Sequence, residues 1–65
     1  MTAPSPRELE VLEAVTRLGS YRDAAEEKGI SVSTVKQHIH SVLIKVGART
    51  HAQAWRTLKE QERVA

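Results

Sequence analysis

Glycine residues divide this chain into four segments, and each glycine is followed closely by a residue that can start a helix. The three glycine and hydroxyl pairs are Gly19 with Ser20, Gly29 with Ser31, and Gly47 with Thr50. Glycine readily adopts the left-handed backbone conformation that often ends a helix. A Ser or Thr side chain accepts a hydrogen bond from the free N–H groups at the start of the next helix. The pattern therefore predicts four short helices joined by tight turns.

The first two segments carry further helix signals. Ser5, Pro6 and Glu8 match a capping box, in which the serine caps, the proline takes the first helical position and the glutamate reaches back. Apolar residues at helical spacing then continue to Gly19, where we expect this helix to end. The second helix is expected over residues 21–28. Its inward-facing residues are predicted to be Ala24 and Ala25.

The third segment has one tight apolar stripe after its cap at Ser31. Spacings of one, three and four residues place these side chains on a single helix face: Val35, Ile39, Val42, Leu43 and Val46. The fourth helix is expected to begin with a capping box of Thr50 and Gln53, and a polar tail is expected after Glu60. No segment alternates apolar and polar residues over a useful length, so the fold is predicted to be all-α.

A chain of 65 residues has room for one small domain. We expect it to occupy residues 1–65, with a packed core over about residues 5–58. A domain of this size buries only about 60% of the surface of its unfolded chain, so a partner would add useful stability. The chain has no cysteine, which excludes disulfides, thiolate zinc sites and thiol catalysis.

Several function classes lack support in the sequence. His38 and His40 lie two residues apart and point to different sides of a helix, whereas metal-binding pairs on helices are four residues apart. No nucleophile elbow, phosphate-cradling glycine loop or buried carboxylate pair is visible, so we expect neither an enzyme nor a cofactor. No apolar run approaches the ~18 residues of a membrane span, and the first residues do not form a secretory signal. We therefore expect a cytoplasmic protein that does not contact a membrane.

Charge is distributed unevenly along the chain. Residues 1–30 carry four basic and six acidic side chains, whereas residues 31–59 carry five basic side chains and no acidic one. All three histidines lie in this acid-free stretch. One half of the domain is therefore positive, which favours a polyanionic partner, although a chance asymmetry of solvated side chains would give the same counts. Tyr21 and Trp55 are the only aromatic residues, which is too few to stack the bases of a single strand.

The connection between the second and third helices is typical of a helix-turn-helix motif. Gly29 suits the sharp turn, Ala25 is small enough to let the helices approach, and Val35 can pack into the corner between them. Tight turns of this kind also occur in helical bundles that bind no nucleic acid. The motif alone therefore leaves both interpretations open.

The outward face of the third helix favours the interpretation as a DNA-binding motif. Opposite the apolar stripe lie residues that can hydrogen-bond to base edges, with one apolar residue further along: Ser33, Lys36, Gln37, His40 and Ile44. The helix contains no acidic residue that would repel phosphates. Ser31, Ser33 and Thr34 cluster at its start, where free N–H groups and the helix dipole favour an anion. Ordinary solvation is the alternative explanation of this polar face.

Three runs of residues together resemble the LuxR/GerE-type helix-turn-helix domain of bacterial transcription regulators. They are SPRELEVL at 5–12, ISVSTVKQHI at 30–39 and KVGART at 45–50, and the resemblance covers about residues 5–58. It implies a four-helix fold whose third helix enters the major groove of double-stranded DNA and whose fourth helix forms a symmetric dimer. The positions that match base-reading residues are Lys36, Gln37 and His40. Those that match phosphate contacts are Ser20, Arg22, Ser33, Thr34, Lys45 and Arg49.

Four positions depart from the pattern of that family. Ala24 replaces a larger branched residue and Lys28 replaces a leucine, so the core at the second helix is expected to be thin or to be covered by the lysine stem. His40 and Ile44 stand where longer polar or basic residues are frequent. His40 can still exchange hydrogen bonds, but Ile44 can only touch an apolar group, such as a thymine methyl or another protein.

The fourth helix offers two roles for its apolar residues. Trp55 can fill the core, or it can form a dimer surface with Leu58 and Ala54. A dimer would add buried surface and double the number of phosphate contacts. The sequence carries no sensor domain, so we expect either a small stand-alone regulator or a fragment of a longer one, and the start at Met1 favours the stand-alone protein. The alternative function is a protein-interaction module that binds RNA polymerase or another regulator, with no DNA binding of its own or only together with a second protein.

Overall fold

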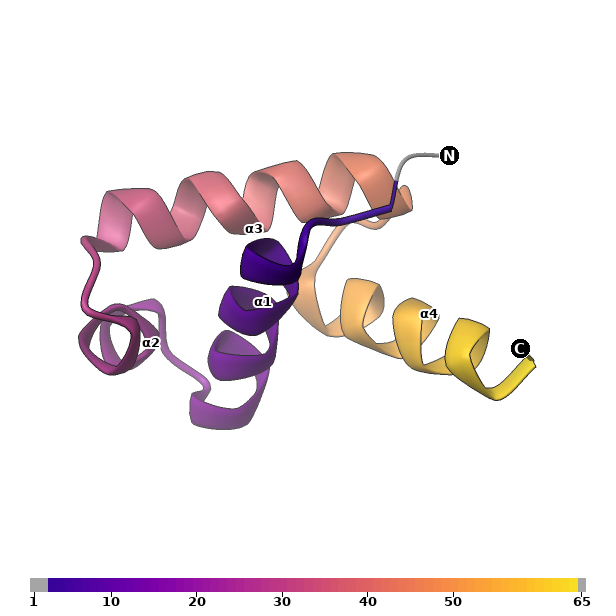
Figure 1. The fold of residues 1–65 in the computed structure, drawn as a ribbon, viewed down its shortest axis with the longest axis horizontal. Coiled ribbons are helices and arrows are strands. Elements are labelled where there is room, and N and C mark those ends of the chain that lie inside the picture. The colour runs from indigo at the N-terminus through magenta and orange to yellow at the C-terminus, as the bar shows by residue number, and fades with distance from the viewer. Residues whose placement is uncertain (1–2, 65) are drawn as a thin grey trace.

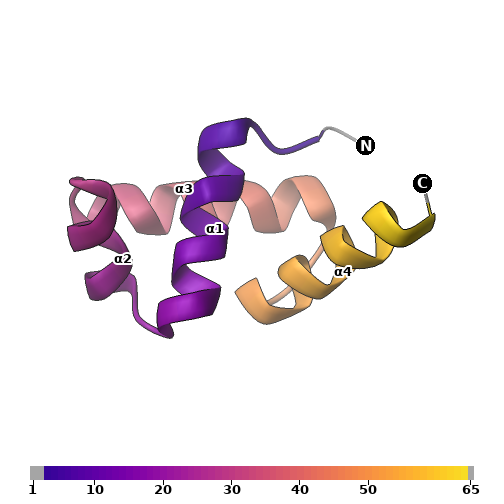
Figure 2. The ribbon, with the colours of Figure 1, turned by 60° about the horizontal axis from the view of Figure 1, so that its bottom comes forward.

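The computed structural model describes residues 3–64, which form four helices. They are α1 (Pro6–Leu18), α2 (Tyr21–Lys28), α3 (Val32–Val46) and α4 (His51–Val64) (Figure 1). No strand occurs among these residues, so the all-α prediction is confirmed. α1 and α3 each pack against all the other helices, and α1 runs across the middle of α3 (Figure 2). α2 and α4 lie towards opposite ends of this central pair (Figure 1). Their first residues still approach each other, with the rings of Tyr21 and His51 edge to face and their centroids 6.3 Å apart.

The predicted helix boundaries are confirmed for the first three helices. The side chains of Ser5, Ser20 and Ser31 each accept a hydrogen bond from a backbone N–H in the following first turn. At the turn between α2 and α3, Gly29 has a φ of +67°, which favours glycine. The N–H of Ile30 donates to the carbonyl of Ala25 at 3.0 Å, which closes the turn in a Schellman-type arrangement. This turn therefore fixes the direction in which α3 leaves α2.

The fourth helix differs from its prediction at both ends. Thr50 Oγ1 accepts from the N–H of Gln53 at 3.1 Å, as a capping box requires, but Gln53 Oε1 accepts from the N–H of Arg49 at 2.8 Å rather than from that of Thr50. α4 also continues to Val64, past Glu60, where we expected a polar tail. Glutamate and glutamine are good helix formers, and charges three residues apart, such as Lys59 and Glu62, support a helix without burial.

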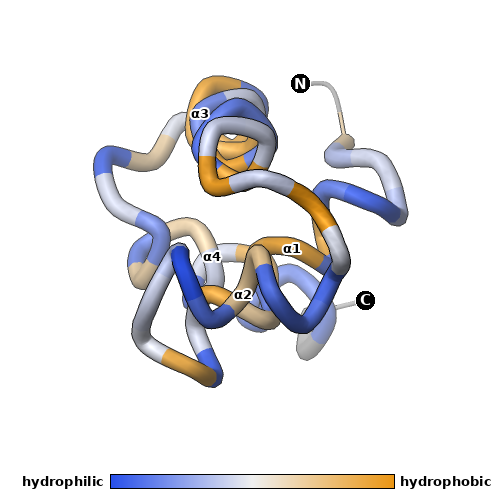
Figure 3. The backbone as a smooth tube through the Cα atoms, turned by 90° about the vertical axis from the view of Figure 1, so that its left-hand side faces the viewer, coloured by the Kyte–Doolittle hydropathy of each residue, from blue (hydrophilic) through white to orange (hydrophobic). Residues whose placement is uncertain are grey.

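The core consists of aliphatic side chains from all four helices. These buried residues are Val11, Leu12, Ala14, Val15, Ala24, Ala25, Val35, Ile39, Val42, Val46 and Ala54. Both alanines of α2 are buried as predicted, and the side chain of Lys28 is only 21% exposed, so its stem lies along the surface of this thin part of the core. Figure 3 views the molecule from the α2 end, so that α3 is seen down its axis. α3 lies on one side of the molecule, and the other helices are grouped on the opposite side.

A polar cluster joins the start of α1 to the second half of α3. Glu8 is only 7% exposed, and its carboxylate accepts hydrogen bonds from the N–H of Ser5, from Ser41 Oγ and from Lys45 Nζ. The Lys45 Nζ to Glu8 Oε1 distance is 2.8 Å. These donors, the lysine first among them, lower the pKa of Glu8 to about 2, because they stabilise its charged form. Glu8 is therefore both a capping residue and a link between two helices.

We expect Glu8→Gln to lower the free energy of unfolding by about 2 kcal/mol at pH 7, because the half-buried Lys45 loses its counter-charge and the buried hydrogen bonds lose their charged acceptor. The folded pKa lies below that of the unfolded chain. The stabilisation is therefore complete above about pH 4.5 and is lost as the pH falls towards 2. Urea unfolding of wild type and variant at several pH values measures this difference.

The control for that experiment is Glu10→Gln. Glu10 forms an exposed pair with Arg7 at 3.4 Å and should change stability by less than about 1 kcal/mol. A gap between wild type and Glu8→Gln that stays constant from pH 7 to pH 2 would contradict the role assigned to the carboxylate.

Candidate nucleic-acid interface

The outward face of α3 is free of contact with the other helices. Val35, Ile39 and Val42 are buried against the rest of the domain. The residues expected opposite this stripe are all exposed: Ser33, Lys36, Gln37, His40 and Ile44. Neither α4 nor any other described segment covers Lys36 or Gln37. A long, convex helix surface is thus available to a partner.

The chemistry of this face is basic and hydrogen-bonding. α3 contains no acidic residue, and its exposed side chains include an ammonium, an amide and an imidazole. At its N-terminus, Ser31 Oγ accepts from the N–H of Thr34 at 3.1 Å and lies 2.9 Å from Thr34 Oγ1. The first backbone hydrogen bond of α3 runs from the N–H of Val35 to the carbonyl of Ser31, so the N–H groups of Val32 and Ser33 have no intrahelical acceptor and remain able to bind an anion. The start of α3 is therefore suited to a phosphate group.

The predicted phosphate contacts fall into two groups at opposite ends of α3. Ser20 and Arg22 belong to the start of α2, and Ser33 and Thr34 belong to the start of α3. α2 and the start of α3 lie at the same end of the molecule (Figure 1). Arg22 is exposed, whereas Ser20 is half-buried and its Oγ accepts from the N–H of Asp23 at 3.2 Å. Lys45 and Arg49 follow at the other end of α3. The fifteen residues of α3 separate the groups by roughly 20 Å.

Lys45 has a different environment from the one its position suggested. Its side chain is 29% exposed, and its ammonium is bound to Glu8. A phosphate would have to share this ammonium with a carboxylate. Sequence reasoning missed this pair, because the two residues are 37 positions apart and only the crossing of α1 over α3 brings them together. Arg49, by contrast, is exposed in the turn before α4.

Apolar side chains of α4 divide between the core and the surface. Ala54 is fully buried, which corrects the expectation that it belongs to a dimer surface, because it offers no area to a second molecule. Trp55 and Leu58 are half-buried and pack at the edge of the core. Lys59 Nζ lies 4.5 Å from the centre of the Trp55 ring, a distance that permits a cation–π contact.

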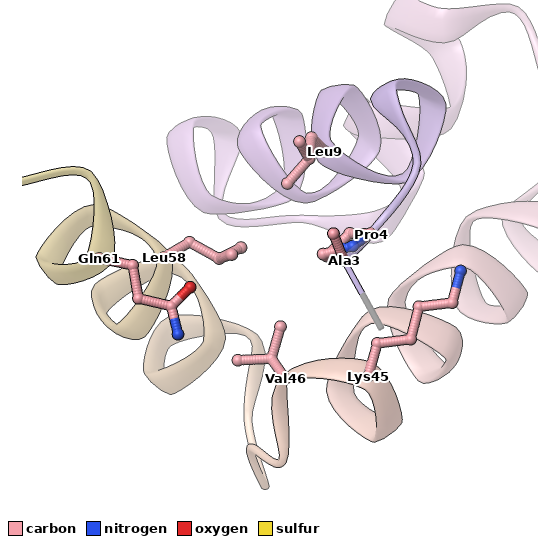
Figure 4. A pocket seen from close by; sticks show the side chains of 7 residues that line it. All are labelled: Ala3, Pro4, Leu9, Lys45, Val46, Leu58 and Gln61. Atoms are coloured by element: carbon pink, nitrogen blue, oxygen red, sulfur yellow. The ribbon is translucent and has the colours of Figure 1, made fainter. Parts of the chain in front are cut away.

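A shallow apolar hollow lies between α1, the end of α3 and α4. Leu9, Val46 and Leu58 point into it from these three helices (Figure 4). A second hollow shares Leu9 and Leu58 and extends along α1 and α4 to Trp55. The two hollows form one apolar strip on the side of the molecule where α4 meets α1. The strip includes both half-buried apolar residues predicted for a dimer surface.

Two further features of residues 3–64 bear on the function. No group of three or more His, Cys, Asp or Glu side chains in this part of the chain is placed to hold a metal ion. No helix in it is both long enough and apolar enough to cross a membrane.

Comparison with known proteins identifies one relative with a described function. The chain is 45% identical over 53 residues to the HTH-type transcriptional activator RamA of Corynebacterium glutamicum. The match covers 82% of this chain but 19% of RamA, so the chain spans about a fifth of the length of that relative. No solved structure matches the chain.

The family comparison agrees with the motifs and with the fold. The family described as bacterial regulatory proteins, luxR family, matches residues 4–58, which include the capped start of α1, the turn at Gly29 and the whole of α3. The match extends into α4 as far as Leu58. The resemblance inferred from the sequence is therefore confirmed, and the chain belongs to the LuxR family of bacterial regulatory proteins.

Proposed function

We propose that this chain is a sequence-specific, double-stranded DNA-binding transcription regulator whose α3 lies in the major groove. The outward face of α3 carries this proposal, because it is exposed, free of acidic residues and rich in hydrogen-bonding groups. A helix of this diameter fits the major groove, where every base pair presents a distinct pattern of donors and acceptors. Membership of the LuxR family and the name of the relative RamA support the same function.

In this proposal Lys36, Gln37 and His40 read bases. Lysine donates to the O6 and N7 acceptors of guanine, and glutamine forms a bidentate pair with adenine. The imidazole of His40 can donate or accept. All three side chains are exposed on the first two and a half turns of α3, the part of a recognition helix that approaches the base edges.

Phosphate groups would be bound at both ends of α3. Ser33, Thr34 and the free N–H groups at the helix start would bind one phosphate, with Ser20 and Arg22 of α2 beside them. Arg49 would reach the backbone from the far end. Lys45 would contribute through its remaining exposed surface, because Glu8 already neutralises much of its charge. Phosphate contacts of this kind set the position of the protein on the duplex rather than its sequence preference.

A symmetric dimer through α4 completes the proposal. The strip lined by Leu9, Trp55 and Leu58 would meet its counterpart in a second copy, since a two-fold interface pairs the same patch on both molecules. Two α3 helices would then read half-sites about one helical turn apart. Once bound to DNA, the dimer would contact RNA polymerase or another regulator. This function would take place in the cytoplasm.

Lys36→Ala should weaken binding to a selected duplex by roughly 1–3 kcal/mol and relax the preference at one base pair, because a base-reading donor is lost. Selection of duplexes from a random pool supplies the probe, and fluorescence anisotropy measures the affinities. Binding to a random duplex should change much less. Equal losses on both duplexes would contradict a base-reading role for Lys36.

Arg22→Ala should instead weaken binding to all duplexes similarly and reduce the slope of log K against log salt by about one. Arg17→Ala is the matched control, because Arg17 on α1 is engaged by Glu13 and Glu27 and should leave the slope unchanged. A wild-type protein whose affinity for DNA hardly depends on salt would favour the protein-interaction module over the DNA-binding function.

Leu58→Glu should convert a dimer to a monomer while keeping the helix content, because a carboxylate at a dimer centre would lose its hydration. Sedimentation equilibrium and circular dichroism measure the two properties. Arg56→Glu is the control, because it also introduces a carboxylate on α4 but on its exposed side, and it should remain dimeric. A monomeric wild type, or a dimeric Leu58→Glu variant, would contradict the proposed interface.

A further inference from the structure

Ile44 is the most exposed large apolar side chain among those described. It is 67% exposed, whereas Leu9, Leu18 and Val32 are 36–37% exposed. At about 100° per residue, Ile44 lies within about 60° of Ser33, Gln37 and His40 around the axis of α3. It therefore stands directly opposite the buried stripe, one helical turn beyond His40. Nothing in the packing of this domain requires an isoleucine there.

The surroundings of Ile44 distinguish it from the apolar strip at α4. The residues that share its face are polar, the exposed ammonium group of Lys36 lies at the edge of that face, and the helix has no acidic side chain. A lone apolar side chain is too small to form a protein-docking patch, which requires a contiguous area of a few hundred Å². The charge of this face instead complements a polyanion, so the occupant that fits it is duplex DNA.

The distance along α3 agrees with a contact inside the groove. Ile44 lies seven positions after Gln37, which corresponds to a rise of roughly 10 Å along α3, and the major groove is about 12 Å wide. The thymine C5-methyl is the apolar group that base pairs present in this groove. We propose, on the basis of the proposed function, that the side chain of Ile44 contacts the C5-methyl group of a thymine and so recognises that base. It thereby extends sequence reading one turn beyond Lys36, Gln37 and His40.

Deoxyuridine substitution tests this contact, because it removes the methyl group and leaves every hydrogen bond of the base pair in place. Each thymine of the selected duplex is replaced singly, and affinity is measured for the full chain and for Ile44→Ala. At one thymine per half-site the wild type should bind roughly fourfold more weakly after replacement, about the effect of one buried methyl group. The Ile44→Ala variant should bind both duplexes equally well.

Two variants act as controls. Leu18→Ala removes a large exposed side chain from α1 and should keep the full sensitivity to deoxyuridine. Ile44→Val keeps a branched apolar side chain and should therefore keep part of the sensitivity to deoxyuridine. If duplexes are bound but no thymine distinguishes wild type from Ile44→Ala, the reading of thymine is wrong and the DNA-binding function stands. If the protein binds no duplex with an affinity that falls steeply as salt is added, the reading of thymine and the DNA-binding function are both wrong.

Discussion

The packing of α1 across the inner stripe of α3 is the contact on which the rest of this structure depends. It buries Val35, Ile39 and Val42 against α1 and its neighbours, and it turns the opposite face of α3 outward. The carboxylate of Glu8 adds a directional link to the same crossing, because Ser41 and Lys45 donate to it from successive turns of α3. Two helices that meet only through apolar side chains can shift slightly along each other. A carboxylate that accepts hydrogen bonds from three donors permits much less shift, because hydrogen bonds depend on distance and angle.

This arrangement places the side chains that stabilise the core and those proposed to read DNA on opposite sides of one helix. The inner side of α3 supplies much of the core of a small domain, and the outer side contributes nothing to that core. The outer side is therefore free to vary in sequence without loss of the fold. His40 and Ile44, which differ from the residues frequent in LuxR-type domains, lie on this side. Departures at α2 are of another kind, since Ala24 and Lys28 alter the packing itself.

Much of the fold could be predicted because its signals are local. Caps at Ser5, Ser20 and Ser31 and the turn at Gly29 depend on residues within five positions of one another. The exposed face of α3 followed from helical periodicity for the same reason.

What the sequence did not disclose depends on tertiary contacts or on competing local partners. The Glu8 to Lys45 pair joins residues far apart in the chain, so neither residue alone indicates it. The burial of Ala54 follows from how α4 meets α1 and α3. The side chain of Gln53 accepts from the N–H of Arg49 rather than from that of Thr50, a choice that the capping-box pattern does not specify.

The most direct test of the account is the amide chemical-shift change of ¹⁵N-labelled protein on addition of a selected duplex, at a protein concentration that holds its oligomeric state constant. The largest changes are expected at Ser33, Lys36, Gln37 and His40 and around Ser20 to Arg22, with smaller changes at the buried residues Val35, Ile39 and Val42. Changes confined to the apolar strip at Leu9, Trp55 and Leu58, with the outward face of α3 unmoved, would contradict it.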